Sequence, residues 1–471
     1  MAARTINVAV IGSGFAGLAA AIEAGNNLPA DAQVVIFEKM PSPGGNSVYN
    51  AGQLAAVGSK YQIAAGIEDS VQLMMDDMLK AGLHLNHPDL LKTMILQSNE
   101  IVEWTELELN IRYRDRVTQL GGHSVPRTLS TLNSSGRDII TPMLDKIDLM
   151  HNVSIEVNSS FQGYVLGENE GSRREVIGVR IGSTEFPGEA PTLVFCRHGV
   201  VLAAGGFSAD VKFRSIQNPS FGVTVGNTNQ RGATAEVLKE TLKIGAMPVQ
   251  LSHIQLGPWT SPDEEGFGQA PFFCIGAGFP YGIIVDPVTS KRFVNEMGNR
   301  HERSMAILKR GYPCICITDR EGAQHSLQKD LSTLEPAVKA YASIEELATA
   351  YDMDPETLRE TIEDYNTGVH IGEDQFHKSL RDDLGPIVKP HFYATRLWPK
   401  VHFCCGGVQI NRNAQVMHID DYPVAGLFAA GEVTGGIHGG DRLGSCSTLD
   451  CLAFGRIAGH SVATIKQFKC I

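Results

Sequence analysis

Positive charge and patterned cysteine are both scarce in this sequence. Of its 471 residues, 40 are Lys or Arg and 52 are Asp or Glu, which gives a formal net charge of −12. This balance argues against nucleic acid as a partner and against a basic membrane-binding face. The nine cysteines form no CxxC pair. We therefore do not expect a metal site, a c-type haem or a disulfide framework. We expect the protein to reside in a reducing compartment.

Long apolar runs are missing as well. No stretch approaches the roughly 18 residues that a membrane-spanning helix needs. Residues 6–11 already have the pattern of a buried strand, so the N-terminus does not resemble a signal peptide. We therefore expect a cytoplasmic protein with no membrane span. Its length exceeds one ordinary domain of about 150 residues.

Glycine, in contrast, is abundant, and its 49 residues are clustered. The first cluster, Gly12-Ser13-Gly14-Phe15-Ala16-Gly17, stands between the strand pattern at 6–11 and a helical run at 18–24. A second strand pattern, at 34–37, ends at Glu38. This order predicts a strand–helix–strand unit of the kind that binds a dinucleotide.

Each residue of this motif has a physical task. Gly12 permits a tight turn, Gly14 lets a pyrophosphate approach the helix N-terminus, and Gly17 lets helix and strand pack closely. Glu38 stands where a carboxylate can accept hydrogen bonds from a ribose. The alternative interpretation is a glycine-rich turn without a ligand.

Further glycine clusters lie at 44–52, 121–124, 199–206 and 426–444. Because such features stand near both ends of the chain, one nucleotide-binding domain must be interrupted by an insertion. The middle differs, with an aromatic-rich stretch at 259–293 and acidic amphipathic helices at 343–365. We predict an α/β fold in which a Rossmann-like domain (1–244 and 396–471) is interrupted by a smaller α+β capping domain (245–395).

The first motif does not separate NAD from FAD, but the end of the chain does. A strand ending in Gly431-Glu432 is typical of flavoproteins. At this point the chain resembles the flavoprotein family of soluble fumarate reductases, succinate dehydrogenase flavoprotein subunits and urocanate reductases, and its substrate region is most similar to urocanate reductases. The resemblance is carried by the motifs at 12–17, 44–47, 121–124, 292–296, 401–403, 406–408 and 431–444.

The resemblance implies FAD as the cofactor. Members with covalent FAD attach it through a histidine in the second glycine segment, and residues 41–60 contain none, so we expect non-covalent FAD. Electrons would come from an external donor, either a protein or a reduced flavin. The FAD-binding residues implied are Gly12, Gly14, Phe15, Ala16, Gly17, Glu38, Lys39, Gly45, Asn46, Ser47, Ala51, Gly52, Ala204, Gly205, Gly431, Glu432, Arg442, Gly444, Ser447 and Leu449.

Three side chains match the family's catalytic groups. Arg300 stands where the proton-donating arginine follows the Arg-Phe-Val-Asn-Glu motif, and His402 and Arg442 match the groups that hold a substrate carboxylate. Reduction of an electron-poor C=C bond needs a hydride, a proton and positive groups near that carboxylate. The resemblance therefore implies a small carboxylate substrate with a conjugated C=C bond.

The pattern departs from fumarate reductases in one segment. Gly257 stands where fumarate reductases have a histidine that holds the second carboxylate. The glutamate and arginine that form their proton relay before the strand at 283–286 are also missing. The relay acid could be replaced by Asp263, Glu264 or Glu265, and the sequence does not decide among them. The same segment gains the rings of Trp259, Phe267, Phe272, Phe273, Phe279 and Tyr281. We therefore expect a reductase of a 2-enoate with an aromatic substituent, urocanate first and cinnamate-type acids next.

Three alternatives remain from the sequence. One is a soluble fumarate reductase with a displaced second carboxylate site. Another is an FAD-dependent 3-ketosteroid-type dehydrogenase, against which the pair His402 and Arg442 counts. The third is a non-catalytic flavin electron carrier, in which Arg300 would meet no substrate.

Overall fold

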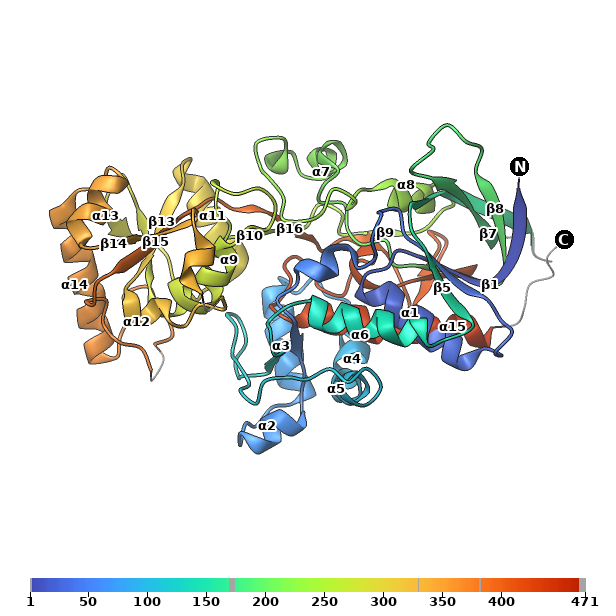
Figure 1. Ribbon diagram of the computed structural model, residues 1–471, viewed down its shortest axis with the longest axis horizontal. Coiled ribbons are helices and arrows are strands. Elements are labelled where there is room, and N and C mark those ends of the chain that lie inside the picture. The colour runs from blue at the N-terminus through green and yellow to red at the C-terminus, as the bar shows by residue number, and fades with distance from the viewer. Residues whose placement is uncertain (1, 169–173, 329, 381–382, 466–471) are drawn as a thin grey trace. The chain divides into compact units, whose positions relative to one another are not determined.

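The computed structural model describes residues 2–168, 174–328, 330–380 and 383–465 (Figure 1). Its contacts divide the chain into two compact units. Unit 1 comprises Met1–Gly222, Asn229–Ile254 and Phe403–Ile471, and unit 2 comprises Val223–Thr228 and Gln255–His402.

Unit 1 is built on an eight-stranded sheet that is parallel at its centre. The strand order is β18-β19-β7-β8-β1-β2-β5, with β6 on β7 and a further pairing of β19 with β8. Strand β1 pairs in parallel with β2 and β8, and β2 pairs in parallel with β5. The strands are β1 (Ala3–Ile11), β2 (Val34–Phe37), β5 (Val153–Glu156), β6 (Ser159–Glu168), β7 (Arg174–Ser183), β8 (Thr192–Leu202), β18 (Gln415–Met417) and β19 (Pro423–Ala429). This sheet confirms the predicted α/β class.

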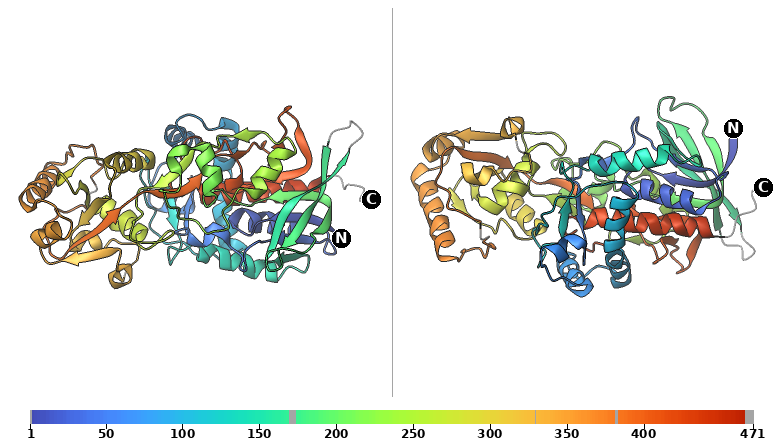
Figure 2. Two further views of the ribbon diagram at one scale, coloured as in Figure 1. Left: turned by 90° about the horizontal axis from the view of Figure 1, so that it is seen from above. Right: turned by 60° about the horizontal axis from the view of Figure 1, so that its bottom comes forward.

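Two helices from opposite ends of the chain pack together in unit 1. Helix α1 (Phe15–Asn27) and helix α15 (Cys446–Thr464) run side by side in both views of Figure 2. A Cβ atom on Gly455 would lie 2.6 Å from Ala16 O, and one on Gly459 would lie 2.3 Å from Ala20 O. Only glycine permits this approach, so the C-terminal helix is fitted to the one that follows the first glycine motif.

Shorter elements complete unit 1. Strand β3 pairs antiparallel with β4, and β9 pairs antiparallel with β17. The remaining elements are η1 (Gly45–Tyr49), β3 (Gln53–Ala55), α2 (Lys60–Ala64), α3 (Val71–Ala81), α4 (Pro88–Leu96), α5 (Ser98–Leu107), β4 (Thr128–Ser130), α6 (Arg137–Asp148), α7 (Val211–Gln217), η2 (Pro219–Phe221), α8 (Glu236–Lys243), β9 (Pro248–Val249), β17 (Gly407–Val408) and η5 (Gly431–Val433).

Unit 2 holds a five-stranded antiparallel sheet in the order β12-β11-β13-β15-β14. Its strands are β11 (Ile283–Asp286), β12 (Lys291–Arg292), β13 (Cys314–Thr318), β14 (Val338–Tyr341) and β15 (Phe392–Leu397). Its helices are α9 (Ala270–Phe273), the π-helix η3 (Cys274–Gly278), α10 (Phe279–Tyr281), α11 (Arg300–Arg310), α12 (Arg320–Ala323), η4 (Leu331–Leu334), α13 (Ile344–Ala350) and α14 (Pro355–Ile371).

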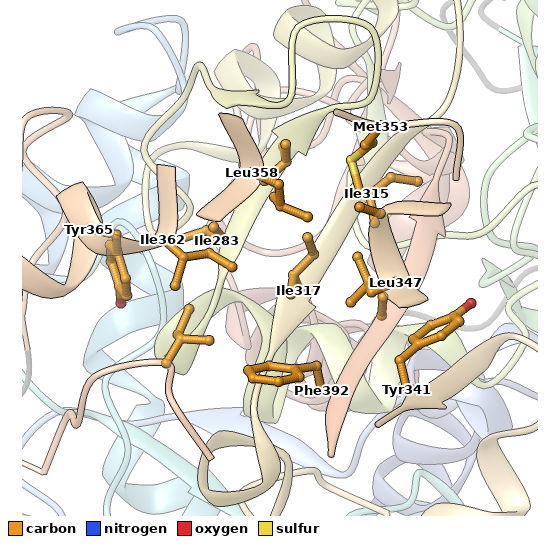
Figure 3. Close-up of a cluster of buried hydrophobic side chains, with 14 residues drawn as sticks. Ile283, Ile315, Ile317, Tyr341, Leu347, Met353, Leu358, Ile362, Tyr365 and Phe392 are labelled. Carbon is orange, nitrogen blue, oxygen red and sulfur yellow. The ribbon is translucent and has the colours of Figure 1, made fainter. Parts of the chain in front are cut away.

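Both faces of this sheet are covered. On β13, Ile315 and Ile317 point into one buried cluster, which Leu347 and Leu358 of α13 and α14 complete (Figure 3). The alternate residues Cys314 and Cys316 belong to a second cluster. This two-residue alternation is that of a strand buried on both sides.

The helical pattern at 343–365 forms two helices, because two N-cap residues each begin a helix of their own. Ser343 caps α13 by accepting from Glu346 N, and Asp354 caps α14 by accepting from Thr357 N. Pro355 then occupies the first turn of α14, where its missing N–H costs nothing.

The longer segment of unit 2, Gln255–His402, begins in β10 (Ile254–Gly257) and ends in β16 (Lys400–Cys404), and these two strands pair; the short segment Val223–Thr228 also belongs to unit 2. None of the helices in the described ranges is long and apolar enough to span a membrane.

Candidate active site

The turn between β1 and α1 is held close to β8 by glycines. Gly12 has a φ of +104°, and a Cβ atom there would lie 2.4 Å from Ala203 O. A Cβ atom on Gly17 would lie 2.0 Å from Gly12 O. Gly14, the N-cap of α1, offers no side chain to the helix, and Phe15 N donates to Ser47 Oγ at 3.0 Å. Ser47 therefore accepts one N–H at the start of α1, and Gly14 offers no capping side chain to the others, which suits an anion.

Glu38, at the end of β2, is fixed by three donors. Ser13 N and Ser13 Oγ donate to Oε2 at 3.1 and 2.6 Å, and Met40 N donates to Oε1 at 2.9 Å. The side chain is 5% exposed. Because a carboxylate can accept about four hydrogen bonds, Glu38 retains acceptor capacity for a ligand.

These residues line a single pocket in unit 1. Twelve of the twenty residues expected to bind FAD lie in its wall: Gly12, Gly14, Phe15, Ala16, Glu38, Lys39, Gly45, Asn46, Ser47, Ala204, Gly205 and Glu432. Eight expected residues do not line it: Gly17, Ala51, Gly52, Gly431, Arg442, Gly444, Ser447 and Leu449.

Three of these eight have a packing role that the structure explains. Gly17 lies under the Gly12 turn, as described above. Gly52 has a φ of +62°, and a Cβ atom there would lie 2.1 Å from Thr131 Oγ1. Leu449 is fully buried in α15.

The opposite wall of the pocket comes from residues that sequence reasoning missed. Lys39 Nζ donates to Thr234 Oγ1 at 2.7 Å and forms an ion pair of 2.5 Å with Glu236. Gln230 N donates to Asn46 Oδ1 at 3.0 Å. Other missed wall residues include Ser13, Ser159, Phe161, Ala203, Gly232, Ala430 and Cys451. Except for Ser13, which is part of the first motif, they lie far along the chain from it.

Glu432 closes the pocket behind Gly205 and Gly206. Its Oε1 accepts from Cys404 N at 2.8 Å. Desolvation raises the pKa of Glu432 to about 7, against the lowering effect of its backbone donors and of Arg442. The pocket thus carries one carboxyl group whose charge changes near neutrality.

Arg442 is buried in unit 1 at 5% exposure. Its guanidinium lies 4.9 Å from the centre of the Phe403 ring, and Nη1 donates to Leu443 O at 3.2 Å. Burial lowers the pKa of Arg442, but a guanidinium stays cationic at any ordinary pH.

Arg300 and His402, in contrast, belong to unit 2. Arg300 begins α11; its Nη1 donates to Gln255 Oε1 at 3.2 Å, and its guanidinium lies 4.4 Å from the centre of the Trp259 ring. His402 Nδ1 and Thr228 Oγ1 are 2.8 Å apart. The imidazole meets Trp259 edge to face at 5.1 Å. Trp259 therefore touches both predicted catalytic side chains of unit 2.

The aromatic residues near 257 divide into two groups. Phe267 lies 6.2 Å from the His402 ring and 5.7 Å from the Phe272 ring. Phe273 and Phe279 belong to the buried core of unit 2, as does Trp259. Tyr281 donates to Asp383 at 2.8 Å and stacks on His325. Only part of the expected aromatic set thus surrounds His402.

The candidate relay acids have structural contacts. Asp263 forms an ion pair of 2.7 Å with Arg396. Glu264 accepts from Gln269 N and Ala270 N at 2.6 and 2.9 Å. Neither contact reaches Arg300.

Comparison with known proteins accounts for the pocket. The FAD binding domain family matches residues 7–448. The chain is 40% identical over 470 residues to an acrylate reductase flavoprotein subunit from Shewanella woodyi, covering 97% of this chain and 91% of that one. It is 31% identical to a urocanate reductase from Eggerthella lenta, over 98% and 75% of the two chains.

Among solved structures, the open conformation of a flavocytochrome c3 fumarate reductase superposes with a TM-score of 0.78. The identity is 29%, and the match covers 98% of this chain and 78% of that one. The N-terminus of α1, the close glycines and the Glu38 carboxylate also fit the pyrophosphate and ribose of a dinucleotide. The chain therefore belongs to the FAD binding domain family and is an FAD-dependent oxidoreductase.

Proposed function

We propose that this protein reduces the C=C bond of a 2-enoate that carries a single carboxylate, using non-covalently bound FAD. Bound FAD supplies the hydride. The relatives named as acrylate and urocanate reductases support this reaction class, because both names denote 2-enoates with one carboxylate. The electrons come from an external donor, a protein or a reduced flavin.

Arg300 is proposed as the proton donor to the carbon that does not receive the hydride. Its place at the start of α11 and its bond to Gln255 hold the guanidinium in one orientation. The face of the Trp259 ring stabilises the positive charge. An arginine gives up its proton only transiently, so its charge also stabilises the enolate-like state.

His402 and Arg442 are proposed to hold the carboxylate. Thr228 fixes the orientation of the His402 ring through Nδ1. Arg442 offers the planar fork that matches a carboxylate. Both groups withdraw charge as the double bond is reduced.

The position of Trp259 is the observation that best supports a substrate with a single carboxylate. A Cβ atom on Gly257 would lie 3.2 Å from the Trp259 ring, so the indole fills the space that a side chain at 257 would need. Trp259 is 2% exposed, and its Nε1 has no hydrogen-bond partner among the described residues. An apolar ring beside Arg300 and His402 accommodates an apolar or heteroaromatic substituent and disfavours a second anion, since an unpaired buried charge costs several kcal/mol.

The proposal is tested by anaerobic reoxidation of the reduced flavin. Acrylate, urocanate and cinnamate are each compared with fumarate at saturating concentration. Fast reoxidation by at least one monocarboxylate, and slow reoxidation by fumarate, supports the assignment. The Trp259→Ala variant should lose this preference, and Phe272→Leu, which changes a ring packed on Phe267, is the matched control.

Soluble fumarate reductase is the second candidate, because the structural similarity to a flavocytochrome c3 fumarate reductase spans nearly the whole chain. Fast reoxidation by fumarate alone would establish it. If none of the four acids reoxidises the flavin, the assignment of these acids as substrates is wrong, and the acceptor is a different compound.

A further inference from the structure

The Gly-Gly-His-Ser motif at 121–124 binds the loop that carries Arg442. His123 is 5% exposed, and its Nε2 lies 2.9 Å from Gly444 O. A Cβ atom on Gly122, whose φ is +92°, would lie 2.7 Å from Leu443 Cδ1. All of these residues belong to unit 1, so the motif packs directly against the residues that follow Arg442.

The other ring nitrogen of His123 fixes its tautomer. Arg127 Nη1 lies 3.0 Å from His123 Nδ1. A guanidinium can only donate, so Nδ1 must accept, and a carbonyl can only accept, so Nε2 must donate. His123 is therefore a neutral imidazole with its proton on Nε2, directed at Gly444 O.

Arg127 is itself held by two carboxylates. Its side chain is fully buried, with Nε and Nη2 donating to Asp69 at 2.9 and 3.0 Å and Nη1 donating to Asp77. Burial alone would lower the pKa of Arg127, but the hydrogen bonds to Asp69 and Asp77 raise it. The donor that fixes the His123 tautomer is therefore permanently charged and rigidly placed.

The loop needs this support because its backbone is strained. Ser445 has a φ of +58°, a conformation unfavourable for a residue with a side chain. Ser445 Oγ donates to Gly444 O at 2.6 Å and lies 2.7 Å from Thr128 Oγ1. Gly444 O thus accepts from both His123 and Ser445 at the point where the loop enters α15.

We infer that His123 is a positioning residue: held as the Nε2–H tautomer by Arg127, it fixes Gly444 O and so sets the direction of Arg442 toward the substrate carboxylate. This inference rests on the proposed role of Arg442. In this inference His123 acts through the loop from Arg442 to Ser445.

Three variants of His123 separate its two hydrogen bonds. His123→Gln can keep a donor near the Nε2 position, His123→Asn can keep an acceptor near the Nδ1 position, and His123→Leu keeps neither. His198, a second buried histidine of unit 1 at 4% exposure on β8, supplies the matched control His198→Leu.

Two measurements are made on the FAD-loaded protein. The first is amide hydrogen exchange of the segment 440–450, followed by mass spectrometry. The second is the steady-state KM and kcat for whichever enoate the reoxidation assay identifies. Loss of one hydrogen bond to a carbonyl corresponds to about a tenfold effect.

His123→Leu and His123→Asn should raise exchange in segment 440–450 and raise KM about tenfold, with kcat changed less than about threefold. His123→Gln should restore both quantities toward those of the parent protein, and His198→Leu should change neither. Unchanged exchange and KM in both His123→Leu and His123→Asn would overturn the inference, as would failure of His123→Gln to differ from His123→Asn.

The exchange measurement needs no turnover. If no enoate is reduced, the proposed function is wrong while the exchange data still decide whether His123 orders the loop. If turnover occurs and only the exchange responds, His123 supports the fold of the loop without positioning Arg442.

Discussion

Replacing Glu432 by Gln should stabilise the FAD-free protein at neutral and alkaline pH, and by much less in acid. Desolvation raises the pKa of Glu432 from 4.5 to about 7, more than its donor Cys404 N lowers it. Glutamine has the same shape and can accept the same hydrogen bond, but it does not ionise. The variant therefore removes the cost of burying the charge and little else.

The size of the effect follows from the two pKa values of Glu432. Because the folded protein holds this proton more tightly than the unfolded chain, the free energy of unfolding falls as pH rises from 4.5 to 7 and is level outside that range. The full difference is about 3 kcal/mol. Since Glu432 is half-buried with one side facing the pocket, this is an upper limit.

The assay is urea unfolding of the FAD-free proteins at pH 5, 6, 7 and 8. The free-energy difference between Glu432→Gln and the parent should grow by about 2.5 kcal/mol at most from pH 5 to pH 8. Glu103→Gln, at an exposed position on α5, is the control and should give a level difference. A Glu432→Gln difference that stays within about 0.5 kcal/mol across the range would refute the reasoning.

Three further outcomes are expected. Arg300→Lys should keep FAD bound, as judged by flavin absorbance, and lose most enoate turnover in the anaerobic assay; near-full activity would remove Arg300 from the mechanism. Gly17→Ala should destabilise the fold by about 3 kcal/mol in urea unfolding, because its Cβ atom would lie 2.0 Å from the backbone oxygen of Gly12. Gly14→Ala should mainly weaken FAD binding in a fluorescence titration, because its Cβ atom would meet only the movable Ser47 Oγ, at 3.2 Å. Equal stabilities of the two variants in urea would contradict this expectation. Burial lowers the pKa of Lys378 from 10.5 to about 8. Because the unfolded chain holds this proton more tightly, the free energy of unfolding of the parent should rise by up to about 3 kcal/mol relative to Lys378→Met as pH increases from 8 to 10.5. Stability curves of the two proteins that stay parallel over this range would contradict the expectation.

The sequence predicts best what neighbouring residues decide. The strand expected at 34–37 is β2, and the helical run at 18–24 lies within α1. Gly12 and Gly17 touch each other and β8, as the motif implies. Local pattern suffices here because turn, helix and strand lie within some thirty residues.

The sequence predicts poorly what distant segments bring together. Lys39 meets Thr234 and Glu236, about 195 positions along the chain, and no pattern marks that pairing. Aromatic residues near 257 also could not be sorted by composition, since Trp259 and Phe273 belong to the same buried cluster of unit 2, but Trp259 also lies against His402. Both outcomes depend on tertiary packing, which a single sequence does not encode in any readable spacing.

The pairing of β10 with β16 has an evolutionary consequence. Because the strands that lead into and out of residues 255–402 are hydrogen-bonded to each other, the two points of insertion are neighbours, and closing the host chain over them costs little conformational entropy. Such a segment can be exchanged between homologues as a cassette. Residues 255–402 include Trp259 and the proposed catalytic side chains Arg300 and His402, whereas Thr228, which bonds to His402, lies outside them. Recombination at these two strands would therefore move the three residues together and leave the residues of the nucleotide pocket in place.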